Sequence, residues 1–198
     1  MTDANATSDR PYITIVSGLP RSGTSMMMQM LEAGGMRIVT DRERKPDDDN
    51  PRGYYEFEPV KKTREDASWL PGAAGKVVKM IYRLLYDLPA TGYAYRVVFL
   101  EREMSEVLAS QQKMLARLGT DGGTSDDEEM AALFRKQLAE VRDWLAAQRS
   151  FSVLYVSYRD AVGDPPTVAA RINEFLGGGL DTEAMAVAVD PSLYRNRA

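Results

Sequence analysis

The stretch that decides the fold is Tyr12-Ile-Thr-Ile-Val-Ser17, followed directly by Gly18-Leu-Pro-Arg-Ser-Gly23-Thr-Ser25. The first six residues form an apolar, β-branched run after Pro11, which predicts a buried strand of the kind found in parallel sheets. Met26 to Ala33 then has helix-forming composition and ends at two glycines. The stretch therefore predicts a strand, a glycine loop and a helix, and the glycine spacing is that of a loop whose backbone N–H groups surround an anion.

Other apolar runs extend this unit into a larger fold. Further strands are predicted at Lys76–Met80, Arg96–Leu100 and Phe151–Val156. Helices are predicted at 59–69, at 105–118, from the capping box Ser125–Glu128 to about Arg149, and before Phe175–Gly177. This alternation predicts an α/β fold, a P-loop-type three-layer sandwich with a central, mainly parallel sheet, in which ligands bind at the carboxyl ends of strands. With 198 residues, 44% of them hydrophobic, we expect one domain over 1–198, with 1–10 as a disordered tail.

Composition limits the chemistry. The chain has no cysteine and no histidine, so disulfides, thiolate metal sites and a histidine base are excluded, and an acid–base step must use Asp, Glu, Lys or Tyr. A net charge of −4 argues against nucleic acid as a partner. There is neither a long uncharged apolar run nor an export signal, so we expect a soluble, cytoplasmic protein without a membrane partner.

The loop departs from that of nucleotide hydrolases. Those proteins need lysine after the second glycine, followed by Ser or Thr for magnesium, but Thr24 stands at the lysine position. The next apolar strand brings Lys79 where a metal-binding aspartate is expected. A cation thus replaces the metal ligand, and no metal requirement is expected. An arginine and three hydroxyls at the positive end of a helix argue against a bare structural turn.

Pro20-Arg-Ser-Gly-Thr-Ser25 after a strand resembles the 5'-phosphosulfate loop of the sulfotransferase family, in the arginine form of tyrosylprotein and many bacterial sulfotransferases. The resemblance implies that these residues bind the donor 3'-phosphoadenosine 5'-phosphosulfate (PAPS): Pro20, Arg21, Ser22, Gly23, Thr24 and Ser25. It also places Arg21 beside the oxygen that bridges sulfate and phosphate.

Two later stretches carry the same resemblance. Arg102 follows a strand and Ser110 lies eight residues on, like the family's pair that holds the donor's 3'-phosphate, although Glu103 and Met104 depart from its pattern. An ion pair of Arg102 with Glu101 or Glu106 is the alternative explanation. The strand leading to Tyr158, followed by Asp164-Pro165, implies a tyrosine that contacts the nucleotide. Further cations for the 3'-phosphate are implied at the C-terminus, where a solvated tail is the alternative: Arg195 and Arg197.

The resemblance implies transfer of a sulfuryl group from PAPS to a hydroxyl or amine, leaving adenosine 3',5'-bisphosphate (PAP). Cations aimed at the bridging oxygen are the main catalytic tool, and Arg21 and Lys79 are the candidates. The histidine base of cytosolic relatives corresponds to Ile81, so we expect a loop carboxylate instead. The carboxylates in the region where tyrosylprotein enzymes carry their base are Asp41, Glu43, Asp49, Glu56 and Glu58, and the leading pair is Glu43 and Glu56.

Three other functions remain open at this stage. A P-loop kinase needs the missing lysine and magnesium ligands. A non-catalytic PAP-binding protein keeps Arg21, Arg102 and Ser110 and needs no base, and Ile81 favours it. An interaction module explains the α/β pattern but not the cations at three strand ends. The acceptor, whether a small molecule or a peptide, and the oligomeric state are not readable from the sequence, because variable loops build acceptor pockets.

Overall fold

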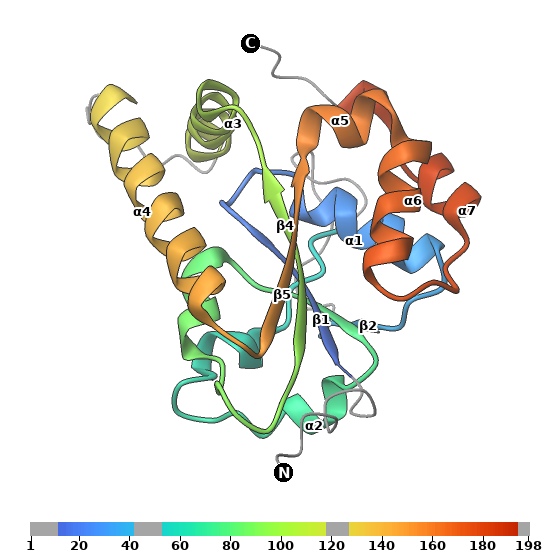
Figure 1. Ribbon diagram of the computed structural model, residues 1–198. Coiled ribbons are helices and arrows are strands. Elements are labelled where there is room, and N and C mark those ends of the chain that lie inside the picture. Colours follow the sequence, from blue (N-terminus) through green and yellow to red (C-terminus); the bar gives the residue numbers. More distant parts are fainter. Residues whose placement is uncertain (1–11, 42–52, 118–126, 194–198) are drawn as a thin grey trace.

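A computed structural model describes residues 12–41, 53–117 and 127–193 (Figure 1). Its strands are β1 (Ile13–Gly18), β2 (Ile38–Val39), β3 (Val77–Lys79), β4 (Tyr95–Glu101) and β5 (Phe151–Ser157). Its α-helices are α1 (Thr24–Ala33), α2 (Leu70–Ala73), α3 (Met104–Arg117), α4 (Asp127–Ala147), α5 (Tyr158–Gly163), α6 (Pro165–Phe175) and α7 (Thr182–Val187). The 3-10 helices are η1 (Glu58–Lys62), η2 (Tyr82–Asp87) and η3 (Pro191–Leu193).

The five strands form one sheet in the order β2-β3-β1-β4-β5, and every pairing between neighbours is parallel. Alternate residues of β4 face opposite sides, so Val97 and Phe99 belong to one core while Val98 and Leu100 belong to the other. The first core packs against α2, α3 and α4, and the second against α1, α6 and α7, with helices on both sides of the sheet in Figure 1. The predicted three-layer α/β sandwich is confirmed.

The topology places a switch point at the carboxyl end of β1. β1 lies between β3 and β4, so the chain leaves it toward one half of the sheet and later returns to the other half. In parallel sheets, ligands bind outside the carboxyl ends of the strands at such a switch point. Val16 pairs with Lys79, and Gly18 pairs with Leu100. The loop after β1 is therefore flanked by the ends of β3 and β4.

Local structure departs from the sequence prediction in several places. The segment 59–69, predicted as one helix, contains only the 3-10 helix η1, and α2 begins afterwards at Leu70. The edge strand β2 and the helix α7 were not predicted. β5 ends at Ser157, whose Oγ accepts a hydrogen bond of 3.3 Å from the Asp160 backbone N–H, so Tyr158 opens the helix α5. Residues 1–10 and the Ser125 cap lie outside the described residues. Within the described part of the chain, no helix is long and apolar enough to cross a membrane.

Candidate functional site

The loop after β1 has a conformation that its glycines make possible. Gly23 has φ +100° at the N-terminus of α1, in the left-handed region that favours glycine. A Cβ added there would lie 2.3 Å from Cδ2 of Tyr158, and one added at Gly18 would lie 2.6 Å from the carbonyl oxygen of Leu100. The first turn of α1 has no side-chain cap. Loop and helix thus present backbone N–H groups at the switch point, which is how proteins bind phosphate.

A buried hydroxyl inside this loop fits an anion site. Ser22 is 1% exposed, and its Oγ has no hydrogen-bond partner among the described residues. Burying a hydroxyl without a partner costs free energy, and such groups in native proteins call for a ligand or an ordered water. Ser22 is therefore a suitable donor for an anion held by the loop.

Lys79 reaches the same loop from the end of β3. Its Nζ lies 3.3 Å from Oγ of Ser25, in the first turn of α1, and also donates a hydrogen bond to the carbonyl oxygen of Tyr54. The Nζ stands 5.9 Å from the centre of the Tyr54 ring. The structure thus brings Lys79 to the N-terminus of α1, directly after the predicted phosphate loop.

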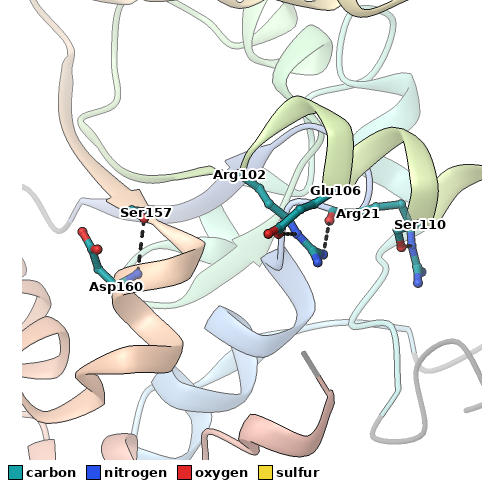
Figure 2. Close-up of polar contacts among 6 residues, drawn as sticks. All are labelled: Arg21, Arg102, Glu106, Ser110, Ser157 and Asp160. Carbon is teal, nitrogen blue, oxygen red and sulfur yellow. Dashed lines mark hydrogen bonds and ion pairs between the residues drawn. The ribbon is translucent and has the colours of Figure 1, made fainter. Parts of the chain in front are cut away.

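Arg21, Arg102 and Ser110 also converge on the loop, as Figure 2 shows. Arg102 Nη1 donates to the Arg21 carbonyl oxygen at 3.1 Å, and Arg21 Nε donates to Ser110 Oγ at 2.9 Å. The Arg102 guanidinium carbon lies 4.3 Å from the centre of the Tyr158 ring, the same ring that closes over Gly23. The structure therefore groups the loop, the strand-end arginine, the helix serine and the tyrosine that the sequence singled out separately.

The arginine after β4 has a carboxylate partner. Arg102 Nε donates to Glu106 Oε2 at 2.8 Å, and the two side chains are only 8% and 2% exposed. Glu101 pairs instead with Arg142 of α4, in a more exposed ion pair. In the sequence, the i,i+4 spacing of Arg102 and Glu106 indicates that the two can form an ion pair, but it does not show that the pair is buried. Sequence reasoning gave Glu106 no functional role.

No family model and no curated protein matches the sequence of this chain. Its structure, however, matches solved structures. The sulfotransferase domain from the curacin biosynthetic pathway superposes with a TM-score of 0.57 at 15% identity, over 92% of this chain and 89% of that domain. The sulfotransferase domain from the Synechococcus PCC 7002 olefin synthase gives a TM-score of 0.54 at 15% identity, over 98% and 90% of the two chains. This chain has the sulfotransferase fold.

Mouse sulfotransferase SULT7A1, solved as a complex with PAP, shares this fold with a TM-score of 0.57 at 17% identity. The match covers 90% of this chain but 64% of the mouse chain.

Three of the candidate bases, Asp41, Glu56 and Glu58, lie within the described residues, and Glu56 and Glu58 follow closely after Tyr54, which contacts Lys79. Glu56 is two residues beyond Tyr54, and its carbonyl oxygen accepts from the Asp41 backbone N–H at 3.2 Å. Asp41 in turn accepts a hydrogen bond of 2.6 Å from the Glu58 backbone N–H. A hydrogen bond to Glu58, together with the charges of Glu58, Glu56 and Asp41, raises the pKa of Lys61. Three of the five candidate carboxylates thus gather in one place.

The remaining site predictions fall outside the described residues: Glu43, Asp49, Arg195 and Arg197. Within the described ranges, no three carboxylates lie close enough together to hold a metal ion. A pocket of about 390 Å³ lies between the ends of β4 and β5 and the helices α3, α4 and α5. It is lined by Glu101, Arg102, Glu103, Met104, Glu106, Arg135, Ser157 and Arg159. The pocket shares Arg102, which donates to the Arg21 carbonyl oxygen, with the loop, but neither Arg21 nor Ser110 lines it.

Proposed function

We propose that this chain is a PAPS-dependent sulfotransferase, which transfers a sulfuryl group to a hydroxyl or amine of a small-molecule or peptide acceptor. The observation that carries the proposal is the convergence of Arg21, Arg102, Ser110 and Lys79 on one glycine loop, in a chain with the sulfotransferase fold. Each cation comes from a different strand end, which a purely structural turn does not require.

The residues present fit the donor. PAPS carries a phosphosulfate at the 5' position and a phosphate at the 3' position, so it needs two separate anion sites. The glycine loop, the orphaned Ser22 hydroxyl and the N-terminus of α1 suit the first. Arg102 and Ser110 suit the second, because a guanidinium presents a rigid fork of donors to phosphate. The mouse enzyme of the same fold was solved with PAP, which supports this choice of nucleotide.

The chemical step follows from the cations. The acceptor oxygen or nitrogen attacks sulfur and forms a new bond to it, while the bond from sulfur to the bridging oxygen breaks and its electron pair leaves with PAP. We assign Lys79 to the charge that grows on that oxygen, because its Nζ lies near Ser25 in the first turn of α1. Arg21 belongs to the glycine loop of the first anion site, and its Nε donates to Ser110 of the second. We therefore assign Arg21 to both anion sites. The acceptor's proton passes to a carboxylate, for which Glu43 and Glu56 stay the candidates.

The first test is calorimetric titration with PAP in the absence of magnesium. We expect metal-independent binding that Arg102→Ala weakens by about 10- to 100-fold, since hydrogen bonds to charged groups contribute about 1.5–3 kcal/mol. Arg142→Ala is the matched control, because it also removes an arginine from an ion pair, but one on the surface with Glu101. A wild-type protein that ignores PAP, or prefers ATP with magnesium, contradicts the proposal and favours a P-loop kinase.

A second experiment separates catalysis from binding alone. The protein is incubated with PAPS labelled in its sulfate and a panel of hydroxyl and amine acceptors, and labelled product is counted. Ile81, which is 41% exposed at the position of the usual histidine, is the feature that favours a non-catalytic PAP-binding protein. Tight PAP binding with no transfer to any acceptor supports that alternative. Transfer that Glu43→Gln or Glu56→Gln abolishes identifies the base.

A further inference from the structure

An almost fully buried carboxylate, Glu106, stands directly against the arginine assigned to the 3'-phosphate. We propose that Glu106 is a positioning residue: it holds the Arg102 guanidinium in place and thereby sets the preference of the site for nucleotides that carry a 3'-phosphate. This inference rests on the proposed function, because it assigns Arg102 to that phosphate.

Three hydrogen bonds join four residues in series, as Figure 2 shows. Glu106 and Ser110 are four residues apart on α3, so they lie on the same face of the helix. Glu106 accepts from Arg102 Nε at 2.8 Å, and Ser110 accepts from Arg21 Nε at 2.9 Å. The two pairs are linked where Arg102 Nη1 donates to the Arg21 carbonyl oxygen at 3.1 Å. Through these bonds, α3 is tied to the loop after β1.

The surroundings of Arg102 explain why a partner is needed. A free arginine side chain has many rotamers, and ordering it when phosphate binds costs part of the binding free energy. Here the Glu106 carboxylate fixes the Nε edge while the Tyr158 ring packs against the guanidinium face. The arginine is therefore ordered in advance.

The charge of Glu106 allows a clear test, because positioning and simple electrostatics predict opposite changes in phosphate binding when that charge is removed. A buried negative charge next to a phosphate site repels the phosphate, so removing it should strengthen phosphate binding if charge alone mattered. If positioning dominates, removing it should weaken phosphate binding, since Arg102 loses its charge-assisted hydrogen bond. The sign of the change thus distinguishes the two roles.

The experiment compares the affinities of PAP and of AMP, which lacks the 3'-phosphate, for the wild type and for Glu106→Gln. We expect the ratio of PAP to AMP affinity to fall by about tenfold in the variant, roughly the contribution of one charge-assisted hydrogen bond. The affinity for AMP should change little. Glu101→Gln is the matched control, since it removes the same charge from a neighbouring carboxylate that pairs with Arg142, and it should keep the wild-type ratio.

Two further variants exclude a merely structural role. In an Arg102→Lys background, Glu106→Gln should not lower the ratio further, because the carboxylate acts through the guanidinium. If Glu106→Gln does not fold, as judged by its thermal unfolding, Glu106→Asp replaces it; this variant keeps the charge on a shorter side chain and should lower the ratio in the same direction.

An unchanged or increased ratio in Glu106→Gln, or in Glu106→Asp where that variant stands in, overturns the inference. An equal loss of PAP and AMP binding does so too, because it indicates general damage to the site. If the wild type binds PAP and prefers it to AMP, either result leaves the proposed function standing. If the wild type does not bind PAP at all, the proposed function and this inference fail together.

Discussion

Replacing Gly23 by alanine tests whether the loop and the tyrosine of α5 form one packed unit. The substitution has two separable effects. Alanine at φ +100° lies in the left-handed region, which costs an L-residue about 1–2 kcal/mol. The new Cβ would also lie 2.3 Å from Cδ2 and 2.8 Å from Cε2 of Tyr158, and forcing an extra methyl into a packed site costs about 1–3 kcal/mol. The expected loss of unfolding free energy is therefore about 2–5 kcal/mol.

Gly35 provides a matched control at the other end of α1. It has φ +95°, and no atom lies within 4 Å of a Cβ built there, so Gly35→Ala pays only for the backbone conformation. We expect this variant to lose about 1–2 kcal/mol, or about 2–8 °C in melting temperature for a domain of this size. Combining Gly23→Ala with Tyr158→Ala should remove the steric part and leave the backbone part, apart from the loss due to truncating the ring.

Thermal unfolding followed by circular dichroism measures all four proteins, and titration with PAP measures the site. Gly23→Ala should also lose most of its affinity for PAP, because the methyl group displaces the loop. Gly35→Ala should bind PAP like the wild type. Equal destabilisation by Gly23→Ala and Gly35→Ala would refute the reasoning, since it would mean that the Tyr158 ring does not close over the loop.

Three further predictions concern catalysis and pH. Lys79→Met should lower the rate of sulfuryl transfer by about 10²–10³-fold, as loss of one donor to a developing charge does, with a smaller effect on PAP binding. Whichever of Glu43→Gln and Glu56→Gln removes the base should lower the transfer rate without changing PAP affinity, whereas Glu58→Gln should leave both unchanged. Burial raises the pKa of the Tyr95 phenol, so the folded protein keeps a proton that the unfolded chain releases above pH of about 10. The resulting stability is full below that pH and is lost as pH rises further; urea unfolding between pH 8 and 11 should show this decline, and Tyr95→Phe should reduce it.

The sequence predicted the fold well where burial is continuous. β1 is buried at every position, and β4 is buried and apolar from Val97 to Leu100, because both faces of a parallel sheet are covered; such runs are readable without a structure. β2 was missed because it has two residues, Ile38 and Val39, which is too short for any periodic pattern. It exists because Ile38 pairs with Val77 and Val39 with Val78 at the edge of the sheet. That strand is a product of tertiary contacts.

The site was predicted as separate pieces but not as an assembly. Spacing pointed to Arg102 and Ser110, and the glycine pattern pointed to the loop. That Arg21 links them was not readable, because the contact joins residues 89 positions apart. Burial of Glu106 depends on which face of α3 turns toward the loop, and a helical spacing alone does not fix that face. The grouping of Asp41, Glu56 and Glu58 around Lys61 is equally tertiary, since Asp41 contacts Glu58 although 17 positions separate them in the sequence.

The backbone at Arg21 shows why an arginine stands there. Its φ of +71° is uncommon for a residue with a side chain, and such conformations persist where the surrounding structure demands them, often at functional sites. A glycine would adopt this turn at lower cost and would still offer its carbonyl oxygen to Arg102. Only a long donor side chain, however, also reaches Ser110. The strained arginine therefore joins the glycine loop to Arg102 through its backbone and to Ser110 of α3 through its side chain, and this double role favours a binding site over a structural turn.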